Sequence, residues 1–256
     1  LQGGMAWVAD ADLAAAVSNG GGLGVIAAGS MPPDLLESQI AKVRTLTDKP
    51  FGVNIMLLSV TADAALEVVE RNRVPVVTTG AGAPGKVIER LKPQGTKVIP
   101  VIASVAQAKR VEKQGADAVI AEGMEAGGHI GEITTMVLVP QIVDAVEIPV
   151  VAAGGVAEPR GVLAAFSLGA EGVQVGTRFV CASESNAHSA FKNEILKARD
   201  RSTAITGAST GHPVRCIQNR LTREFARLEK AGASVEKLEK LGTGRLRAAV
   251  VDGDVD

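Results

Sequence analysis

Aromatic side chains and cysteines are scarce in this chain of 256 residues. Phe, Trp and Tyr together make up 2% of it, and no recognised nucleic-acid-binding module is visible, so we do not expect it to bind nucleic acid. The two cysteines, Cys181 and Cys216, give neither a disulfide framework nor metal-ligand spacing. We therefore expect a reducing, cytoplasmic setting and no metal site.

Long apolar runs are also absent. One of the longest, Val98–Ala103, is far shorter than the roughly 20 residues of a membrane span, and no signal-peptide pattern is present. We expect no membrane association. The hydrophobic content of 46% is nevertheless enough for one large core, either in a single barrel or in a main domain with a small appendage.

Charge is nearly balanced in total but unevenly distributed. Residues 181–247 carry 13 Lys/Arg against 7 Asp/Glu, whereas the rest of the chain carries 14 against 21. A basic C-terminal section on an acidic body is able to steer an acidic partner or an anionic ligand. An ordinary solvated helical surface gives the same pattern, so charge alone leaves both interpretations open.

Short apolar runs recur along the first 180 residues, with stretches of helical periodicity between them. Eight runs are predicted strands, namely Leu1–Met5, Leu23–Ala27, Phe51–Ile55, Val76–Thr79, Val98–Ile102, Ala118–Ala121, Val150–Ala153 and Gly172–Val175. Continuous apolar strands that alternate with helices indicate a parallel sheet covered by helices. Eight such units fit an α/β fold of the TIM (β/α)8 barrel type better than an open doubly wound sheet.

The pattern of apolar and polar residues changes after Thr177. Residues 185–199, 214–230 and 235–241 read as polar helices with apolar stripes, without strands between them. We predict a barrel over residues 1–180, a small C-terminal helical cap module over 181–247 at the barrel mouth, and a return segment to the barrel over 248–256.

The most informative stretch runs from Ala121 to Glu132, directly after the sixth predicted strand. It holds four glycines and His129, one of three histidines in the chain. Glycine lets the backbone approach a ligand closely, and histidine exchanges a proton near neutral pH. Because barrel enzymes hold their chemistry at the carboxyl ends of strands, the stretch predicts an active-site loop. A flexible turn with an exposed histidine is the alternative.

Glycines also follow the last two predicted strands, as Gly154-Gly155 and Gly176-Thr177. Loops at these positions of a barrel commonly bind phosphate, because glycine exposes backbone amides and a helix N-terminus adds partial positive charge. We expect a phosphorylated substrate or a flavin mononucleotide there, with plain tight turns as the alternative.

Three other features have more ordinary interpretations. Gly80–Gly85 fits the G-x-G-x-x-G dinucleotide pattern, but no acidic residue follows about 20 positions later, so we interpret it as the loop after the fourth strand. Trp7 is expected in the core or in the wall of a pocket. His188 is expected on the surface of a polar helix, and His212 in a turn that could reach the barrel mouth.

Several long runs match one known family closely. They are Gln2–Ala9, Lys49–Leu58, Thr78–Gly82, Glu122–Gly131, Ala152–Val156, Val173–Phe179 and Leu221–Arg223. On these runs the chain strongly resembles the FMN-dependent enoyl-acyl-carrier-protein reductase II family, within the larger nitronate monooxygenase (2-nitropropane dioxygenase-like) group. Both ends, and the segments around 58–62 and 231–235, look shorter than in that family.

The resemblance implies FMN at the strand ends of a TIM barrel, with NADH or NADPH as hydride source for a trans-2-enoyl thioester on acyl carrier protein. His129 matches the family's active-site histidine, as proton donor or as partner of the thioester carbonyl. The positions that match the flavin site are Gly4, Met5, Asn54, Glu122, Gly154, Gly155, Gln174, Gly176 and Thr177. A monovalent cation and a homodimer stay open as further components.

The basic cap, including Arg215, Arg220, Arg223 and Arg227, suits an acidic carrier protein. Two other functions stay open. A nitronate monooxygenase would use the same fold, FMN and histidine, with the histidine as base and oxygen as oxidant. A non-catalytic barrel that binds a flavin or a phosphorylated ligand would act as a sensor.

Overall fold

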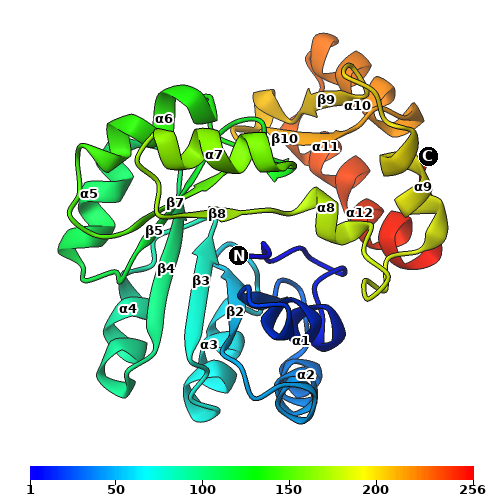
Figure 1. The fold of residues 1–256 in the computed structure, drawn as a ribbon. Helices are drawn as coiled ribbons and strands as arrows, with labels where there is room; N and C mark the ends of the chain where they lie inside the picture. Colours follow the sequence, from blue (N-terminus) through cyan, green and yellow to red (C-terminus); the bar gives the residue numbers. More distant parts are fainter.

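The computed structural model of this protein describes every residue from Leu1 to Asp256. Seven parallel strands form one curved sheet in the order β1-β2-β3-β4-β5-β7-β8. They are β1 (Gly24–Ala27), β2 (Phe51–Met56), β3 (Val76–Gly80), β4 (Lys97–Ile102), β5 (Val119–Glu122), β7 (Val150–Ala153) and β8 (Gly172–Gln174). Figure 1 shows these strands inside a layer of helices, with the C-terminal part of the chain at one side.

The helices around the sheet follow the strands along the chain. They are α1 (Ala11–Asn19), α2 (Pro33–Leu46), α3 (Ala62–Arg71), α4 (Gly85–Leu91), η1 (Lys92–Gln94), α5 (Val105–Lys113), α6 (Thr135–Val143), α7 (Pro159–Ser167) and α8 (Thr177–Val180). This strand-helix alternation confirms the predicted TIM barrel. No helix in the protein combines the length and the apolar character that a membrane span requires.

The segment before α1 closes the barrel between β8 and β1, although the predicted strand Leu1–Met5 is reduced to a single bridge. Gln2 forms this parallel bridge with Val175, and its backbone N–H donates to the carbonyl of Leu23 at 3.0 Å. Its side-chain amide replaces further strand pairing, because it accepts from the Val25 N–H at 3.0 Å and donates to the Val25 carbonyl at 3.2 Å. The barrel is therefore sealed partly by a buried side chain.

Alternation along the strands divides the apolar residues into two cores. Val53, Val77 and Val119 face outward and pack in one large cluster with the covering helices. Ile120 and Val151 face inward and fill the barrel interior. Each fully buried side chain of this kind contributes about 1.5–3 kcal/mol relative to an exposed one.

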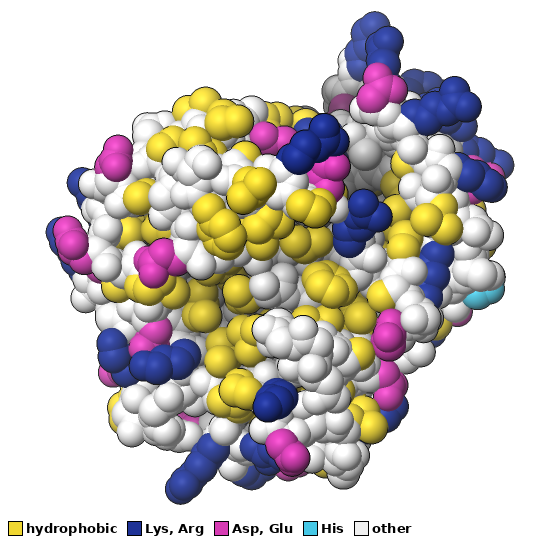
Figure 2. All heavy atoms as spheres, viewed as in Figure 1, with side chains coloured by type: hydrophobic (Ala, Val, Ile, Leu, Met, Phe, Trp, Pro, Cys, Tyr) yellow, Lys and Arg dark blue, Asp and Glu magenta, His cyan; other side chains and the backbone are white.

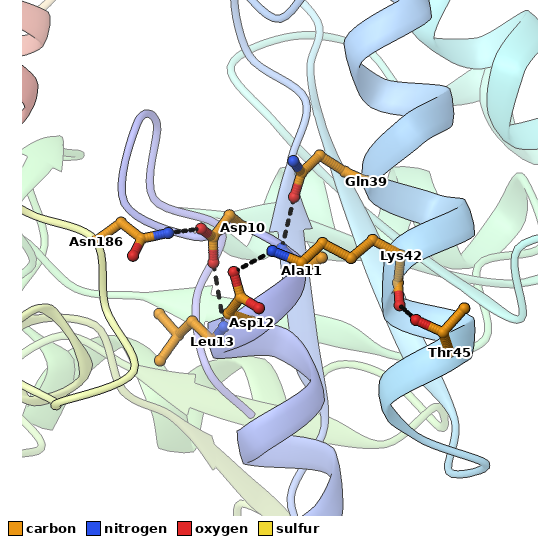
Figure 3. Close-up of polar contacts among 8 residues, drawn as sticks. All are labelled: Asp10, Ala11, Asp12, Leu13, Gln39, Lys42, Thr45 and Asn186. Carbon is orange, nitrogen blue, oxygen red and sulfur yellow. Dashed lines mark hydrogen bonds and ion pairs between the residues drawn. The ribbon is translucent and has the colours of Figure 1, made fainter.

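The N-terminus of α1 is fixed by neighbours from two distant parts of the chain (Figure 3). Asp10 caps the helix, since its carboxylate accepts from the Leu13 N–H at 3.1 Å. Its other oxygen accepts from the side-chain amide of Asn186, which lies in the segment before α9. Gln39 of α2 accepts from the Ala11 N–H at 2.9 Å. The loop between the barrel-closing segment and α1 is therefore fixed at its end by α2 and by the segment before α9.

The C-terminal part of the chain is mainly helical but contains a small sheet. Its elements are α9 (Ser189–Lys197), β9 (Thr203–Thr206), η2 (Ala208–Thr210), β10 (Val214–Ile217), α10 (Arg220–Lys230), α11 (Val235–Gly242), α12 (Arg245–Arg247) and η3 (Ala248–Asp252). The short strand β6 (Gly128–His129), β10 and β9 form an antiparallel sheet in that order.

The prediction that this part lacks strands is therefore wrong. Residues 214–217, expected at the start of a helix, pair with β9 in the small sheet, and the first two of them also pair with β6. The helix begins only at Arg220, where Asn219 caps it. The helix expected over 185–199 is also shorter, because it begins only at Ser189: His188 is its N-cap, and the Nδ1 of His188 accepts from the Ala190 N–H at 3.1 Å.

Candidate functional site

Polar side chains point into the barrel at the carboxyl ends of the strands. Ile120 faces the barrel interior, so Glu122, two residues further along β5, faces the same side. On β8, Val173 packs against the outer core, which turns Gln174 inward. Asn54 of β2 donates from its amide to the Thr78 hydroxyl of β3 at 2.9 Å. Three of the predicted flavin-site residues thus line one mouth of the barrel.

The backbone before α1 passes very close to this mouth. A Cβ atom on Gly4 would lie 2.3 Å from the Cβ of Asn54, so only glycine fits there. The sulfur of Met5 lies 3.6 Å from the place where a Cβ on Gly176 would be. The structure therefore places Gly4 against Asn54 and Gly176 near Met5.

The loops after β7 and β8 lie side by side because their strands are paired, with Ala153 opposite Gln174. Gly154 and Gly155 have φ angles of +97° and +74°, which favour glycine. A Cβ on Gly154 would also lie 2.8 Å from the carbonyl of Gly123. Thr177 begins the short helix α8 directly after Gly176. The arrangement fits the predicted phosphate-binding corner.

Glu122 is the most perturbed acid of the site. Burial raises its pKa from 4.5 to about 7, and its carboxyl forms no hydrogen bond within the protein. Glu125, three residues later, behaves differently, because it accepts from the Thr135 N–H at 2.9 and 3.1 Å at the start of α6. A buried carboxyl that is half protonated near neutral pH and free to bind a ligand is typical of a functional site.

His129 lies at the rim of this mouth, in β6. Its strand pairs with β10, with Val214 opposite His129, and the Ile130 N–H donates to the carbonyl of Pro213 at 3.0 Å. Within the glycine-rich stretch, Gly128 and His129 are therefore held in a paired strand, whereas residues 123–127 before them form a turn. Partial burial lowers the pKa of His129, and the nearby His212 lowers it further. The imidazole makes no hydrogen bond within the protein and keeps an exposed face, so it is available to a substrate.

Two residues of this region, Thr78 and Thr135, were not assigned to the site from the sequence, and a third, Arg215, was given a different role. Thr78 lies directly opposite Asn54 in the paired strands β2 and β3, so its side chain faces the same side of the sheet. The alternation of side chains along β3 was the signal that could have placed it at the mouth. The Thr135 hydroxyl lies 2.9 Å from the Gly154 carbonyl and fixes the loop after β7. Arg215, expected among the docking arginines, donates from Nε to the Met124 carbonyl at 3.1 Å and thereby joins the small sheet to the glycine-rich stretch.

Trp7 lies outside the core. It is 37% exposed, adopts a φ of +66° and stacks under the guanidinium of Arg247, 5.6 Å from the ring centroid. This contact joins the loop before α1 to the C-terminal part of the chain. The glycines of Gly80–Gly85 follow β3 and lead into α4, so they form the strand-end loop that the sequence predicted.

Comparison with known proteins identifies the family. The family model described as nitronate monooxygenase matches residues 1–65 and 57–256. FabK from Thermotoga maritima has 54% sequence identity and a TM-score of 0.96, over 99% of this chain and 81% of that chain. A nitroalkane oxidase from Streptomyces ansochromogenes has 34% identity and a TM-score of 0.86, over 99% of this chain and 86% of that chain.

The name of another relative contains a coenzyme A thioester. The (3aS,4S,5R,7aS)-5-hydroxy-7a-methyl-1-oxo-octahydro-1H-indene-4-carboxyl-CoA dehydrogenase of Rhodococcus jostii is 42% identical over 225 residues, which are 88% of this chain. The match spans 64% of that relative's length. On its family match, its identity to these relatives and its fold, the chain belongs to the nitronate monooxygenase family.

Proposed function

We propose that this protein is a flavin-dependent reductase of 2-enoyl thioesters that uses NADH or NADPH. The observation that carries the proposal is the likeness to FabK, an enoyl-acyl-carrier-protein reductase II, at 54% identity over nearly the whole chain. The site agrees with it, because the polar barrel mouth, the glycine-lined phosphate corner and His129 at the rim are the parts that such a reaction needs.

The residues at the mouth fit FMN. The Gly4 backbone packs directly against Asn54, so the chain passes close to the mouth, and Asn54 and Gln174 offer amide donors and acceptors to the edge of a flavin ring. Protonated Glu122 adds a donor. The loops at Gly154-Gly155 and Gly176-Thr177 would hold the phosphate. When bound, FMN supplies two-electron hydride chemistry between the nicotinamide and the enoyl thioester.

The remaining task of the chain is to orient the thioester and to handle a proton. His129 has a lowered pKa, so its imidazole is mostly neutral at pH 7 and donates an N–H hydrogen bond to the thioester carbonyl. This bond stabilises the negative charge that develops on the carbonyl oxygen during reduction. Glu122, with a pKa of about 7, keeps a proton inside the mouth at neutral pH.

Further parts of the proposal concern the setting of the enzyme. Residues 1–180 would form the flavin-binding barrel, 181–247 its cap and 248–256 the return segment. The thioester would be carried by acyl carrier protein in the cytoplasm. A monovalent cation and a homodimer are compatible with this scheme, and neither contributes a step to it.

A nitronate monooxygenase is the second candidate, because the family model carries that description and the Streptomyces nitroalkane oxidase superposes closely. A neutral imidazole at His129 would serve there as the base that removes a proton from the nitro compound. Both reactions use the same site, so kinetics must separate them.

Anaerobic stopped-flow absorbance of the FMN-loaded protein tests the choice. We expect NADH or NADPH to bleach the flavin band rapidly, and crotonyl thioester to restore it. Bleaching by a nitronate with no response to either nicotinamide would refute the reductase proposal and support the monooxygenase. A protein whose flavin responds to none of these compounds would be a non-catalytic binder.

A further inference from the structure

A basic groove lies on the C-terminal part of the chain, apart from the residues of the flavin site. It has a volume of about 210 Å³ and is formed where the end of α9, the segment before β9, the end of β10 and the first turn of α10 meet. Its charged residues are Lys197, Arg201, Arg223 and Glu194. The Glu194 carboxylate lies 3.4 Å from the Lys197 ammonium, whereas neither arginine forms an ion pair.

The groove brings together two arginines without an acidic partner. Three other arginines of the C-terminal part do have acidic partners, in the pairs Arg227–Glu224, Arg245–Asp254 and Arg247–Asp252, at 3.8, 3.8 and 3.1 Å. Figure 2 shows the Lys and Arg side chains gathered on this part of the molecule. Two free guanidiniums in one groove suit a phosphate group, which they bind through paired hydrogen bonds.

The groove lies at a defined distance from the proposed active site. Val214 pairs with His129, and Gln218, four residues further along the chain from β10, lines the groove. At about 3.4 Å per strand residue, this separation is roughly 14 Å. The chain of atoms that joins the sulfur to the phosphorus in the 4′-phosphopantetheine arm is about as long as the backbone of four residues. The extended arm therefore also spans roughly 14 Å.

We propose that Arg201 and Arg223 bind the phosphate of the 4′-phosphopantetheine arm that carries the enoyl thioester. This inference rests on the proposed function and names how its substrate is held. Both acyl carrier protein and coenzyme A contain this phosphate. Leu196, next to Lys197 and 71% exposed, offers the carrier an apolar contact. A nicotinamide dinucleotide suits the groove less well, because only Ala198 and Ile217 give it apolar lining and no aromatic ring faces it.

Steady-state kinetics of the FMN-loaded double variant Arg201→Gln/Arg223→Gln test the proposal. Lys230→Gln/Lys237→Gln removes the same charge from exposed positions outside the groove and is the control. We expect the KM for crotonyl-acyl carrier protein and for crotonyl-CoA to rise about five- to thirtyfold in the groove variant, as for the loss of two exposed charge contacts. The KM for crotonyl-N-acetylcysteamine, which lacks the phosphate, and the kcat should not change.

Three results would overturn the inference. They are an equal rise in KM for the phosphate-free thioester, a rise confined to one of the two carriers, and a rise in the KM for NADPH instead. Calorimetric binding of 4′-phosphopantetheine gives a readout that needs no turnover: binding should weaken in the groove variant, whereas pantetheine should bind equally weakly to both proteins. If no enoyl thioester is reduced, the proposed function fails, and the calorimetry still decides the groove.

Discussion

Replacement of Glu122 by Gln should make the protein more stable at high pH. Burial raises the pKa of this carboxyl from 4.5 to about 7 in the folded state. Between these two values the folded protein keeps a proton that the unfolded chain releases, so folding stability falls as pH rises through this window. The loss is about 1 kcal/mol at pH 5 and about 3 kcal/mol at pH 8. Gln resembles the protonated carboxyl in shape and never ionises, so the variant avoids this loss.

Urea unfolding of the flavin-free proteins, followed by circular dichroism at pH 5 and pH 8, measures the difference. Flavin is removed because a ligand that binds only the folded state would shift the apparent stability. The variant should gain about 2 kcal/mol more over the parent at pH 8 than at pH 5. Glu125→Gln is the control, because it removes a carboxylate from the start of α6 and should lower stability by about 0.5 kcal/mol. An equal difference at both pH values for the Glu122 variant would refute the burial argument.

Three further substitutions test other parts of the site. Gly4→Ala should lower the free energy of unfolding by about 3 kcal/mol and weaken FMN binding, because the new Cβ would lie 2.3 Å from the Cβ of Asn54. Urea unfolding and fluorescence titration measure the two effects, and no change in either would mean that the backbone moves freely there. Gly154→Ala should cost a similar amount, since alanine at φ +97° is strained and would lie 2.8 Å from the Gly123 carbonyl; unchanged stability and FMN affinity would contradict this. His129→Ala should change stability by less than about 0.5 kcal/mol, and kcat for crotonyl thioester should fall about 10²- to 10⁴-fold; full activity would remove His129 from the mechanism.

Local sequence patterns were sufficient for the barrel and for most of its mouth. The period-two alternation along each strand turns Asn54, Glu122 and Gln174 inward, and this information lies within a few neighbouring residues. The glycine pairs after β7 and β8 were likewise readable, because glycine marks backbone angles that other residues avoid. The roles of these residues toward FMN stay a prediction.

The C-terminal part shows where local patterns mislead. Residues 214–217 were assigned to a helix because a polar helix follows directly, yet they pair with β6 and β9. The partner strand β6 lies more than 80 residues earlier in the chain. Pairing over such a distance depends on how the barrel and the later elements pack, which no short window of sequence contains.

The sequence by itself thus determined the strand-helix order, the inward parity of the polar residues and the places where only glycine fits. Tertiary structure alone decided the chemical state of the site's acid and the long-range contacts that hold the site in place. The side chain of Gln2 completes the barrel through hydrogen bonds to β1. Burial, which depends on the whole fold, raises the pKa of Glu122. His129 is held in place by β10, and Arg215 reaches across 91 residues to the same stretch, because long-range contacts form only once the chain has folded.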